Sequence, residues 1–585
     1  MSETLTGNAE PRRGTARAAA ALGIVLLLVG CHPALPDADT LTAKSPPEDR
    51  SAGAFARTDP WLLTTTDRDA ARGTHGIFLG NGAFGVTVGP SGGTDANSVS
   101  FVAGRYDANE NLIRQPLPPT TLPVPKPGEP YSQTLDMRHG VLLTQKGDVT
   151  VATYVAAGGK ALSVAGANDP ALAAHEAAWA KRWDAADIQI DGDPDAQQLV
   201  HKLMFDLLQS TRPSASESIP PESLSGDFYK GHIFWDAEVW MFPALLAQHP
   251  DYARSIIDYR FKHLDQARAL ARAEGCAGAD FPWESAASGK EVAPGGFSEG
   301  RHVTAGVGWA AWQCYLATHD QAYLKAEGQP LLSAIADYWA TRAKLDPTDG
   351  KYHVRKVFGP DELKGTVDDN TYTNAMARAS LLAATQAARI VGKVPNPLWA
   401  TVAARIALPF DPAQHRYLAR AADDGQKTKQ ADGELLLYPA ELPMDNTTAN
   451  ATFDFNAARP IRNGPAMTAS IHALIAARLG RTAEAEHDFS DAYRPFLRGP
   501  FLLFSEKRSL DRCVFTTGAG GVLQSVLYGF GGLDWNHWDH ITTSPVCLPP
   551  TWKKLTITGI RRAGKRYTLT VTPHGRTLIE QPAPR

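Results

Sequence analysis

The sequence predicts a mainly α protein with β regions at both ends: a β-sandwich, then a helical barrel, then a small C-terminal β-sheet. Short alternating runs punctuated by Gly and Pro fill residues 57–165, as is typical of strands joined by turns. Apolar residues at helical spacing take over after Asp169. Runs at 554–560 and 566–572 then predict a hairpin. Helices separated by long loops favour an α/α barrel, because two concentric rings of helices bury their apolar faces and gather the loops at one end.

Composition limits the classes of function. At 585 residues the chain is too long for one hydrophobic core, so several domains are expected. Lys and Arg number 58 against 62 Asp and Glu, which gives a net charge of -4 and no basic excess to attract phosphate backbones. We therefore expect no nucleic-acid partner. The 13 Trp and 16 Tyr supply flat faces on which sugar rings stack.

Residues 1–31 predict a lipoprotein signal peptide. Arginines precede an apolar run over residues 18–29, which is shorter than the roughly 20 residues that span a bilayer. Leu28-Val-Gly-Cys31 resembles a bacterial lipobox, so Cys31 is expected to carry the lipid. Arg12-Arg13 also permits a twin-arginine signal, so the export route stays open.

The predicted location is the bacterial cell envelope, with the membrane as a partner through the lipid anchor. His32 follows the cysteine where Asp would retain a lipoprotein in the inner membrane, so the outer membrane or periplasm is favoured. Residues 32–56 are rich in Pro, Ala, Asp and Ser without periodicity, which predicts a disordered tether. The wide spacing of Cys276, Cys314, Cys513 and Cys547 does not demand a disulfide.

The domain boundaries follow from where the pattern changes. We expect an abbreviated β-sandwich at 57–165, a helical linker at 166–195, the barrel at 196–540 and the C-terminal sheet at 541–585. Periodicity predicts helices at 170–184, 195–210, 250–273, 303–318, 320–344, 371–391 and 465–479.

The first candidate for chemistry lies in the string Tyr229-Lys-Gly-His-Ile-Phe-Trp-Asp-Ala-Glu-Val-Trp-Met-Phe-Pro243. So many polar and aromatic residues in one stretch need partners if they are buried. Trp235 is suited to stack on a sugar face while Asp236 accepts hydrogen bonds from hydroxyls. The alternative is a helix start, with Asp236 as its cap and Trp235 in the core.

The second candidate is Phe358-Gly-Pro-Asp-Glu-Leu363, ahead of a helix expected to begin near Thr371. Gly-Pro forces a loop, and a carboxylate at its tip can face a cleft. An acid that protonates a glycosidic oxygen needs a raised pKa, which partial burial supplies. Asp361 and Glu362 both qualify by chemistry, and the alternative is a pair of surface acids capping the helix.

The third candidate is Glu506 in Phe504-Ser-Glu506, followed by a glycine-rich loop around Thr517-Gly-Ala-Gly-Gly521. Glycines permit close backbone approach, and a second carboxylate there can activate water. Inverting glycoside hydrolysis requires two carboxyl groups roughly 6.5–9.5 Å apart. Taken singly, Glu506 fits a surface residue better than a catalytic one.

Together these strings resemble glycoside hydrolase family 65. The motifs occur in the family's order: Gly231-His-Ile-Phe-Trp-Asp236, Trp283-Glu-Ser-Ala286, Arg301-His-Val-Thr304, Gly359-Pro-Asp-Glu362, Lys429-Gln-Ala-Asp432 and Thr517-Gly-Ala-Gly-Gly521. The resemblance implies an N-terminal β-sandwich, an (α/α)6 barrel and a C-terminal sheet, with Glu362 as general acid. It places substrate binding on Trp235, Asp236, Lys429 and Gln430, with Trp283, Glu284 and His302 lining the same pocket.

The family contains inverting hydrolases and inverting phosphorylases. Phosphorylases carry a His-containing loop before the glycines, whereas this chain has Arg512-Cys-Val-Phe-Thr516 there and a carboxylate at Glu506. We therefore expect hydrolysis of an α-glucoside such as kojibiose or trehalose, with Glu506 as general base. The alternatives are a phosphorylase and a lipoprotein that binds glycans without catalysis.

The remaining expectations concern partners and specificity. Asp361-Glu-Leu-Lys364 departs from the Asp-Glu-Tyr-His of many relatives, which puts the acceptor sugar in doubt. The sequence shows no metal-ligand spacing, so we expect no metal and no cofactor. A small carbohydrate is the expected substrate. A homodimer stays open, as relatives often dimerise.

Overall fold

The structure is a computed structural model. It describes residues 55, 59–69, 76–117, 122, 128–159, 161–166, 169–511 and 514–582. The predicted signal peptide with Cys31, and nearly all of the predicted tether, lie outside these residues. Within the described part of the chain, no helix combines the length and apolar character needed to cross a membrane.

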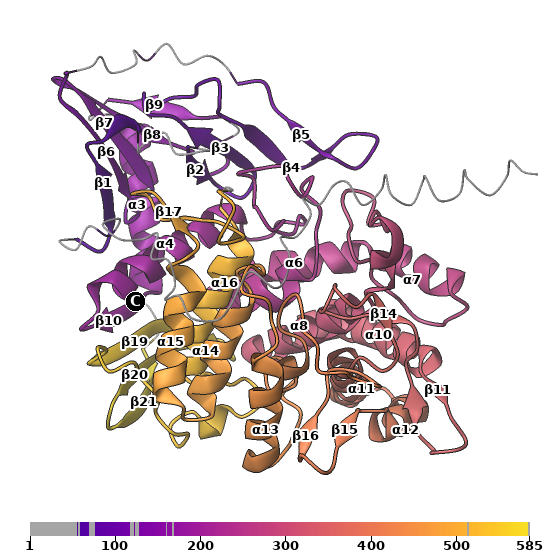
Figure 1. Cartoon of the computed structure of the whole chain (residues 1–585). Helices are drawn as coiled ribbons and strands as arrows, with labels where there is room; N and C mark the ends of the chain where they lie inside the picture. The colour runs from indigo at the N-terminus through magenta and orange to yellow at the C-terminus, as the bar shows by residue number, and fades with distance from the viewer. Residues whose placement is uncertain are drawn as a thin grey trace, which may run out of the picture. The chain divides into compact units, whose positions relative to one another are not determined.

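The N-terminal region contains the predicted β-structure, arranged as two antiparallel sheets (Figure 1). One sheet has the order β1-β6-β7-β8-β9 and the other has the order β2-β3-β4-β5. Phe101 and Leu135, one from each sheet, have no exposed surface and belong to one core. The strands are β1 (Leu62–Thr65), β2 (Ile77–Gly80), β3 (Phe84–Val88), β4 (Ser100–Tyr106), β5 (Leu112–Arg114), β6 (Tyr131–Asp136), β7 (Val141–Lys146), β8 (Val149–Tyr154) and β9 (Ser163–Ala165).

The linker differs from the prediction of helix alone. Helix α3 (Pro170–Ala185) begins after the cap Asp169, whose side chain accepts from Ala171 N, and it packs on the β1-to-β9 sheet. Strand β10 (Ile188–Asp191) then joins the C-terminal sheet by pairing with β19 (Lys554–Arg562). Periodicity missed β10, because its four residues acquire a partner only from the far end of the chain.

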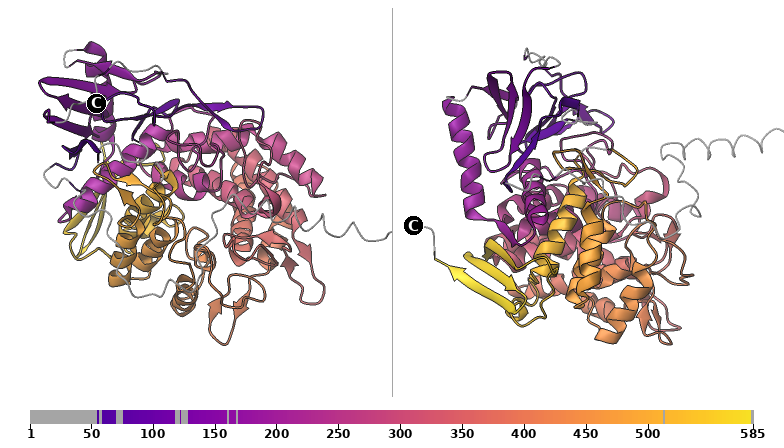
Figure 2. Two further views of the ribbon diagram at one scale, coloured as in Figure 1. Left: turned by 45° about the horizontal axis from the view of Figure 1, so that its top comes forward. Right: turned by 60° about the vertical axis from the view of Figure 1, so that its left-hand side comes forward.

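The C-terminal sheet confirms the predicted hairpin and extends it. Its order is β10-β19-β20-β21, with β20 (Lys565–Thr572) and β21 (Gly575–Gln581). Figure 2 shows this sheet at one side of the helices, away from the N-terminal sheets. Leu555, Ile557 and Leu569 are fully buried, so the face of the sheet that carries them packs against the helical domain.

The region between the sheets is helical, and the structure divides it into more and shorter elements than the periodicity predicts. The predicted helices at 303–318 and 371–391 are confirmed as α8 and α11, whereas 250–273 breaks at His263 and 320–344 is interrupted by a π-helical turn. The elements are α4 (Pro194–Ser210), η2 (Ala237–Met241), α5 (Phe242–Leu246), α6 (Pro250–Lys262), α7 (Leu264–Ala273), η3 (Gly295–Glu299), α8 (His302–Thr318), α9 (Gln321–Tyr323), η4 (Leu324–Gly328), α10 (Gln329–Arg342), α11 (Thr371–Ile390), α12 (Pro397–Arg405), η5 (Gly433–Leu436), α13 (Asn446–Ala457), α14 (Thr468–Arg478), α15 (Thr482–Tyr493), α16 (Thr516–Gln524), η6 (Ser525–Phe530) and η7 (Trp538–His540).

Neighbouring helices pack pairwise. Helix α11 contacts both α8 and α10, α14 contacts α15, and α16 contacts α4, η2 and α14. These contacts establish a packed helical domain with one continuous core. They do not by themselves establish a closed ring of six helix pairs, so the (α/α)6 barrel stays a prediction.

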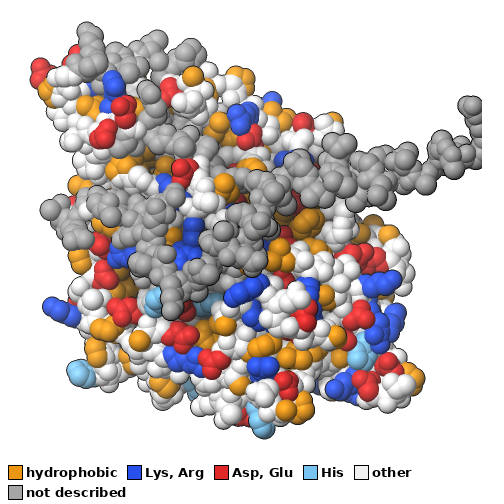
Figure 3. Space-filling view, in the orientation of Figure 1, with side chains coloured by type: hydrophobic (Ala, Val, Ile, Leu, Met, Phe, Trp, Pro, Cys, Tyr) orange, Lys and Arg blue, Asp and Glu red, His pale blue; other side chains and the backbone are white. Residues whose placement is uncertain are grey.

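Short two-stranded ladders connect the helices and carry the candidate residues. They pair β11 (Lys344–Leu345) with β12 (Tyr352–His353), β13 (Val357–Phe358) with β14 (Thr366–Val367), β15 (Phe410–Asp411) with β16 (Arg416–Tyr417), and β17 (Leu497–Arg498) with β18 (Leu503–Phe504). On the face drawn in Figure 3, basic and acidic side chains are interspersed over the described residues, as the near-neutral net charge predicts.

Candidate active site

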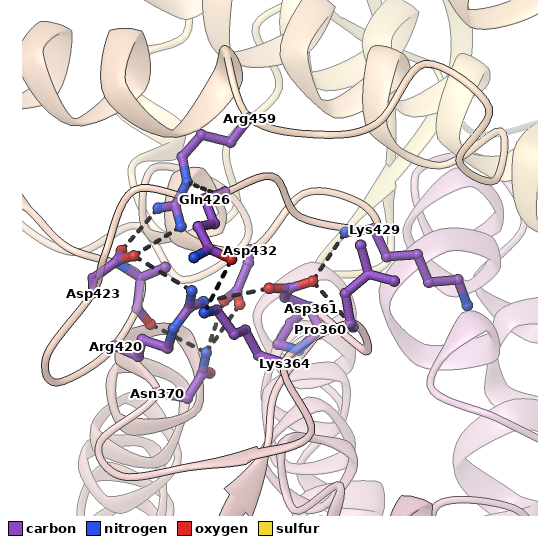
Figure 4. Close-up of polar contacts among 12 residues, drawn as sticks. Pro360, Asp361, Lys364, Asn370, Arg420, Asp423, Gln426, Lys429, Asp432 and Arg459 are labelled. Atoms are coloured by element: carbon purple, nitrogen blue, oxygen red, sulfur yellow. Dashed lines mark hydrogen bonds and ion pairs between the residues drawn. The ribbon is translucent and has the colours of Figure 1, made fainter. Parts of the chain in front are cut away.

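The loop that joins β13 to β14 carries the two acids that sequence could not separate, and their surroundings separate them. Asp361 is 2% exposed and accepts hydrogen bonds from the backbone N–H of Lys429 at 2.9 Å and of Leu363 at 3.3 Å. The guanidinium of Arg420 lies 3.4 Å from its other oxygen (Figure 4). With both oxygens occupied, Asp361 fixes the loop and is not free to donate a proton to a sugar.

The contacts of Asp361 belong to a larger buried network (Figure 4). Arg420 also pairs with Asp423, and two guanidinium nitrogens of Arg459 donate hydrogen bonds to Asp423 at 2.8 Å each. The Arg459 side chain holds the pKa of Asp423 below its usual range, although burial acts in the opposite direction. Buried charges that are paired and hydrogen-bonded in this way favour a single loop geometry.

Asn370 ties the same network to helix α11. Its Oδ1 caps the helix by accepting from Thr373 N at 2.9 Å, and its amide nitrogen donates to both oxygens of Asp432. Asp432 is buried, and its pKa is raised to about 7 chiefly by that burial. The helix cap predicted near Thr371 is thus Asn370, whereas the two acids of the loop do not cap.

Glu362 lies beside Asp361 but faces different partners. It is half-buried, and the ammonium of Lys429 lies 2.6 Å from its Oε2. Gln430 is buried and donates from its side chain to the carbonyl of Pro360 at 2.9 Å. The predicted Lys429–Gln430 pair therefore contacts the predicted acid loop directly.

Asp236 precedes η2, yet its carboxylate does not cap that turn, so the capping alternative is wrong for this side chain. Oδ1 instead accepts from the hydroxyl of Thr517 at 2.7 Å. The pKa of Asp236 is raised to about 7, chiefly by burial, with smaller contributions from the negative charges of Glu506 and Glu362. Both predicted catalytic carboxylates thus act electrostatically on one buried acid, which is the pattern of a functional site.

Glu506 follows β18 and is 4% exposed, so it is not a surface residue. Its main-chain oxygen accepts from Ala466 N at 2.8 Å, and the Lys507 ammonium lies 3.7 Å from Oε1. The hydroxyl of Tyr229 is hydrogen-bonded to the Glu506 side chain. Burial, and then the Glu506 charge, raise the pKa of Tyr229 well above its usual range.

The glycine-rich segment after Glu506 was predicted as a loop, and the structure corrects this: residues 516–524 form helix α16. A Cβ at Gly520 would meet the carbonyl oxygen of Trp240 at 2.4 Å, and one at Gly521 would meet Ser470 Oγ at 2.4 Å. The glycines weaken the helix by about 1 kcal/mol each. They also let α16 approach η2 closely enough for Thr517 to reach Asp236.

An aromatic cluster lies behind the acid loop. His302 packs edge-on against Trp235 at 4.6 Å and Trp283 at 5.1 Å between ring centroids, and its Nδ1 contacts the carbonyl of Phe358 at 3.2 Å. Burial lowers the pKa of His302 to about 3, so the ring is neutral and its Nδ1–H donates. His302 has no exposed surface, and the tryptophans are 3% and 4% exposed. His302 therefore contacts both tryptophans and the start of the acid loop, and links them.

Glu284 is half-buried, with 17% of its side chain exposed, and its Oε2 lies 2.8 Å from Nδ1 of His232. The two segments are paired, since Ile233 and Ser285 form an isolated β-bridge. His232, Tyr229 and Thr517 had no individual role in the sequence prediction, whereas Asp361 was a candidate for the general acid. Tyr229 and His232 stood in a string already singled out, but only the fold shows which partners they contact.

One pocket among the described residues lies apart from these side chains, and its lining includes Trp309 and Gln313. On α8 these lie seven and eleven residues beyond His302, roughly 10 and 16 Å along the helix axis. Arg478 and Glu441, which also line this pocket, are paired with each other at 2.6 Å. We assign the chemistry to the carboxylate cluster around Asp236.

Other features of the described residues bear on cofactors and disulfides. No group of three or more His, Cys, Asp or Glu side chains in the described ranges is arranged to hold a metal ion. Cys276, Cys314 and Cys547 are buried free thiols, while Cys513 falls outside the described residues.

Comparisons with known proteins show which proteins the chain is similar to. Residues 202–411 match the glycosyl hydrolase family 65 central catalytic domain. A kojibiose hydrolase from Mucilaginibacter mallensis is 41% identical over 406 residues, which cover 68% of this chain and 59% of that protein. A kojibiose phosphorylase from Halothermothrix orenii is 29% identical and covers 65% of this chain and 56% of that protein.

A solved structure extends the likeness to the fold. It is named as a candidate kojibiose phosphorylase from the human microbiome, and it superposes with a TM-score of 0.71 at 15% identity. The match covers 90% of this chain and 96% of that one. The chain spans about three fifths of the length of two curated kojibiose hydrolases that it matches, 59% of one and 58% of the other.

Proposed function

We propose that the chain is an inverting glycoside hydrolase of family 65 that releases glucose from an α-glucoside, a proposal supported by the match of residues 202–411 to the family's central catalytic domain. One observation supports this most strongly: Glu362 and Glu506, 144 residues apart, both act on the buried carboxylate of Asp236. Two carboxylates around one sugar position are what glycoside hydrolysis requires.

In the proposed reaction Glu362 is the general acid and Glu506 the general base. Glu362 protonates the leaving oxygen of the glycosidic bond, while Glu506 removes a proton from water as the water attacks the opposite face of the anomeric carbon. The Tyr229 hydroxyl orients the base. Asp236 and Lys429 bind hydroxyls of the glucose ring, supported by Trp235, Gln430, Trp283 and Glu284.

Water is the proposed nucleophile, rather than phosphate. A phosphorylase needs donors for phosphate and no base, whereas Glu506 is a buried carboxylate that repels an anion. The higher identity to the kojibiose hydrolase, 41% against 29% for the phosphorylase, supports the same choice. Kojibiose is therefore the first substrate to test.

The test is a screen of α-linked glucose disaccharides with and without phosphate, followed by NMR of the product anomer. We expect β-glucose at the first time points, independent of phosphate. Strict phosphate dependence with formation of a glucose 1-phosphate would overturn the proposal. Sugar binding without any turnover would leave the glycan-binding alternative in its place.

We also propose that the protein is exported and lipid-anchored through Cys31, supported by the lipobox-like Leu28-Val-Gly-Cys31. Labelling of the full chain with a palmitate analogue in a bacterial host tests this. Wild-type label that is lost in Cys31→Ser is the expected result, and an unlabelled wild type contradicts it.

A further inference from the structure

The β4–β5 hairpin of the N-terminal sheets contacts the segment that carries the Trp-Asp motif. The hydroxyl of Tyr106 donates to the carbonyl of Gly231 at 2.6 Å, and Leu112 N donates to the carbonyl of Lys230 at 2.8 Å. Gly231 has a φ of +71°, and a Cβ there would lie 2.6 Å from Cβ of Leu112. The hairpin is therefore packed directly against the backbone at Gly231, four residues before Trp235.

At the tip of this hairpin, Glu110 makes two contacts with the same wall. Its carbonyl oxygen lies 3.0 Å from Nε2 of His232, and its carboxylate accepts from Ser288 N at 3.1 Å. His232 thus sits between the N-terminal hairpin and Glu284, with one ring nitrogen on each. Its side chain is 3% exposed, so no water competes for these contacts.

The two partners of His232 determine where its protons are. The Glu110 carbonyl can only accept, so Nε2 must carry a hydrogen. Nδ1 lies 2.8 Å from Oε2 of Glu284, and two unprotonated acceptors at that distance would repel each other. One proton therefore lies between Nδ1 and Oε2, on whichever atom holds it.

Charged side chains from several neighbouring segments lie around this pair. The carboxylate of Glu291 accepts from the backbone N–H groups of Trp283 and Glu284, and the carboxylate of Glu110 lies on the other side at Ser288. From helix α6, Arg260 is neutralised by a bidentate pair with Glu238. The segment of His232 contributes Lys230, which is exposed.

We propose that His232 is a positioning residue that fixes the Glu284 carboxylate in the sugar site from the N-terminal hairpin, with one proton shared between them. Of the two carboxylate oxygens of Glu284, only Oε2 has a hydrogen-bond partner among the described residues. The other oxygen, Oε1, is therefore available for a sugar hydroxyl. The N-terminal sheets then form part of the catalytic machinery. This inference rests on the proposed function for its kinetic consequence only.

The kinetic test is a double-mutant cycle on the full chain with kojibiose. His232→Gln and Glu284→Gln are each expected to raise KM about tenfold, the change that corresponds to one charge-assisted hydrogen bond, with a smaller effect on kcat. The double variant is expected to match the worse single variant, because the two residues act as one unit. Additive effects would overturn the proposal.

His175→Gln is the matched control. Its Nε2 also lies 3.0 Å from a backbone carbonyl, that of Gly140, and it is buried, but it faces no carboxylate in the site. Its KM should equal that of the wild type. If His175→Gln raised KM as much as His232→Gln, the effect would be general loss of packing and the proposal would fail.

A spectroscopic arm requires no turnover. Proton NMR of the wild type should show a downfield signal from the proton shared by Nδ1 of His232 and Oε2 of Glu284, assigned by its loss in His232→Gln, and it should vanish or broaden in Glu284→Gln. A wild-type spectrum without this signal would overturn the shared proton even if hydrolysis is confirmed. Conversely, this signal in a chain that hydrolyses no α-glucoside would refute the proposed function and leave this contact standing.

Discussion

Lys429 binds both carboxylates of the acid loop by different atoms: its backbone N–H donates to Asp361 at 2.9 Å, and its ammonium lies 2.6 Å from Glu362. The first contact fixes where the loop lies, and the second brings a positive charge to the proposed proton donor. Lys429 thereby affects both the position of the loop and the electrostatic surroundings of Glu362 at its tip.

Glu362→Gln should lower kcat for kojibiose by about 10²–10⁴, the usual range for general acid catalysis. The loss should be much smaller with α-glucosyl fluoride, because fluoride leaves without being protonated. Glucose release measures both. The control is Glu327→Gln, which removes a carboxylate that pairs with Arg254 outside the site. Equal losses on the two substrates would contradict the role of acid.

Glu506→Ala should abolish water attack and leave room for a small anion. With α-glucosyl fluoride and azide, this variant is expected to form β-glucosyl azide, because azide needs no general base. NMR of the product identifies the anomer. The wild type under the same conditions should give glucose alone, since the Glu506 carboxylate repels azide. An α-azide would indicate retention and contradict the inverting mechanism.

Asp236→Asn should be more stable than the wild type at high pH. Because burial raises the pKa of Asp236 to about 7, the stability that its protonated form contributes is present below pH 4 and is lost as the pH rises through about 7. Asn cannot ionise and still accepts from Thr517. The difference in Tm, variant minus wild type, should therefore grow from pH 5 to pH 8.

The quantity to compare is the difference in Tm between Asp236→Asn and the wild type, because other buried groups titrate in the same pH range. Burial lowers the pKa of His249 and His302 to about 3, which makes the fold gain stability as the pH rises from 3 to 6.5, opposite in sign to Asp236. Subtracting the wild-type Tm at each pH removes their contribution. A difference that does not change with pH would refute the prediction.

Arg420→Gln should destabilise the fold and slow catalysis together. Arg420 is 3% exposed and is paired with the buried carboxylate of Asp361, so removing it takes away that cationic partner at a cost of about 3–5 kcal/mol, while Asp423 keeps its pair with Arg459. Urea unfolding and kcat measure the two effects. Lys565→Gln, which removes an exposed pair with Glu580, is the control and should change neither. A stable Arg420→Gln with full kcat would show that the loop does not need the network.

Gly231→Ala should lower both stability and kcat/KM. The left-handed backbone costs about 1–2 kcal/mol for Ala, and the added Cβ overlaps Leu112 on the N-terminal hairpin. Gly275→Ala is the control, since Gly275 has a φ of +72° with no atom within 4 Å of the added Cβ. It isolates the backbone cost. Equal Tm losses in the two variants would show that the hairpin contact has no energetic weight.

The sequence predicted the helices whose apolar spacing is regular, such as α8 and α11, to within one residue at either end. It did not predict α16, because three glycines in nine residues oppose a helix locally, and only their close contacts with β18, η2 and α14 in the fold explain them. Strand β10 was missed for a similar reason, since its partner lies over 350 residues away.

For the site, motif order identified the segments that meet, but it could not assign the neighbouring acids Asp361 and Glu362. That distinction depends on Arg420 and Lys429, which reach the loop from another part of the chain. The partner of each buried polar atom is a property of the fold, and sequence spacing does not contain it.

The pairing of β10 with β19 brings the entry and the exit of the helical domain side by side. The two ends of the helical domain are thereby joined through a single strand pair. A circular permutant that joins these ends and opens the chain at an exposed turn would keep every helix contact. In contrast, deleting the residues from Lys554 onward would remove the only neighbour of β10 in that sheet and leave an unpaired strand edge.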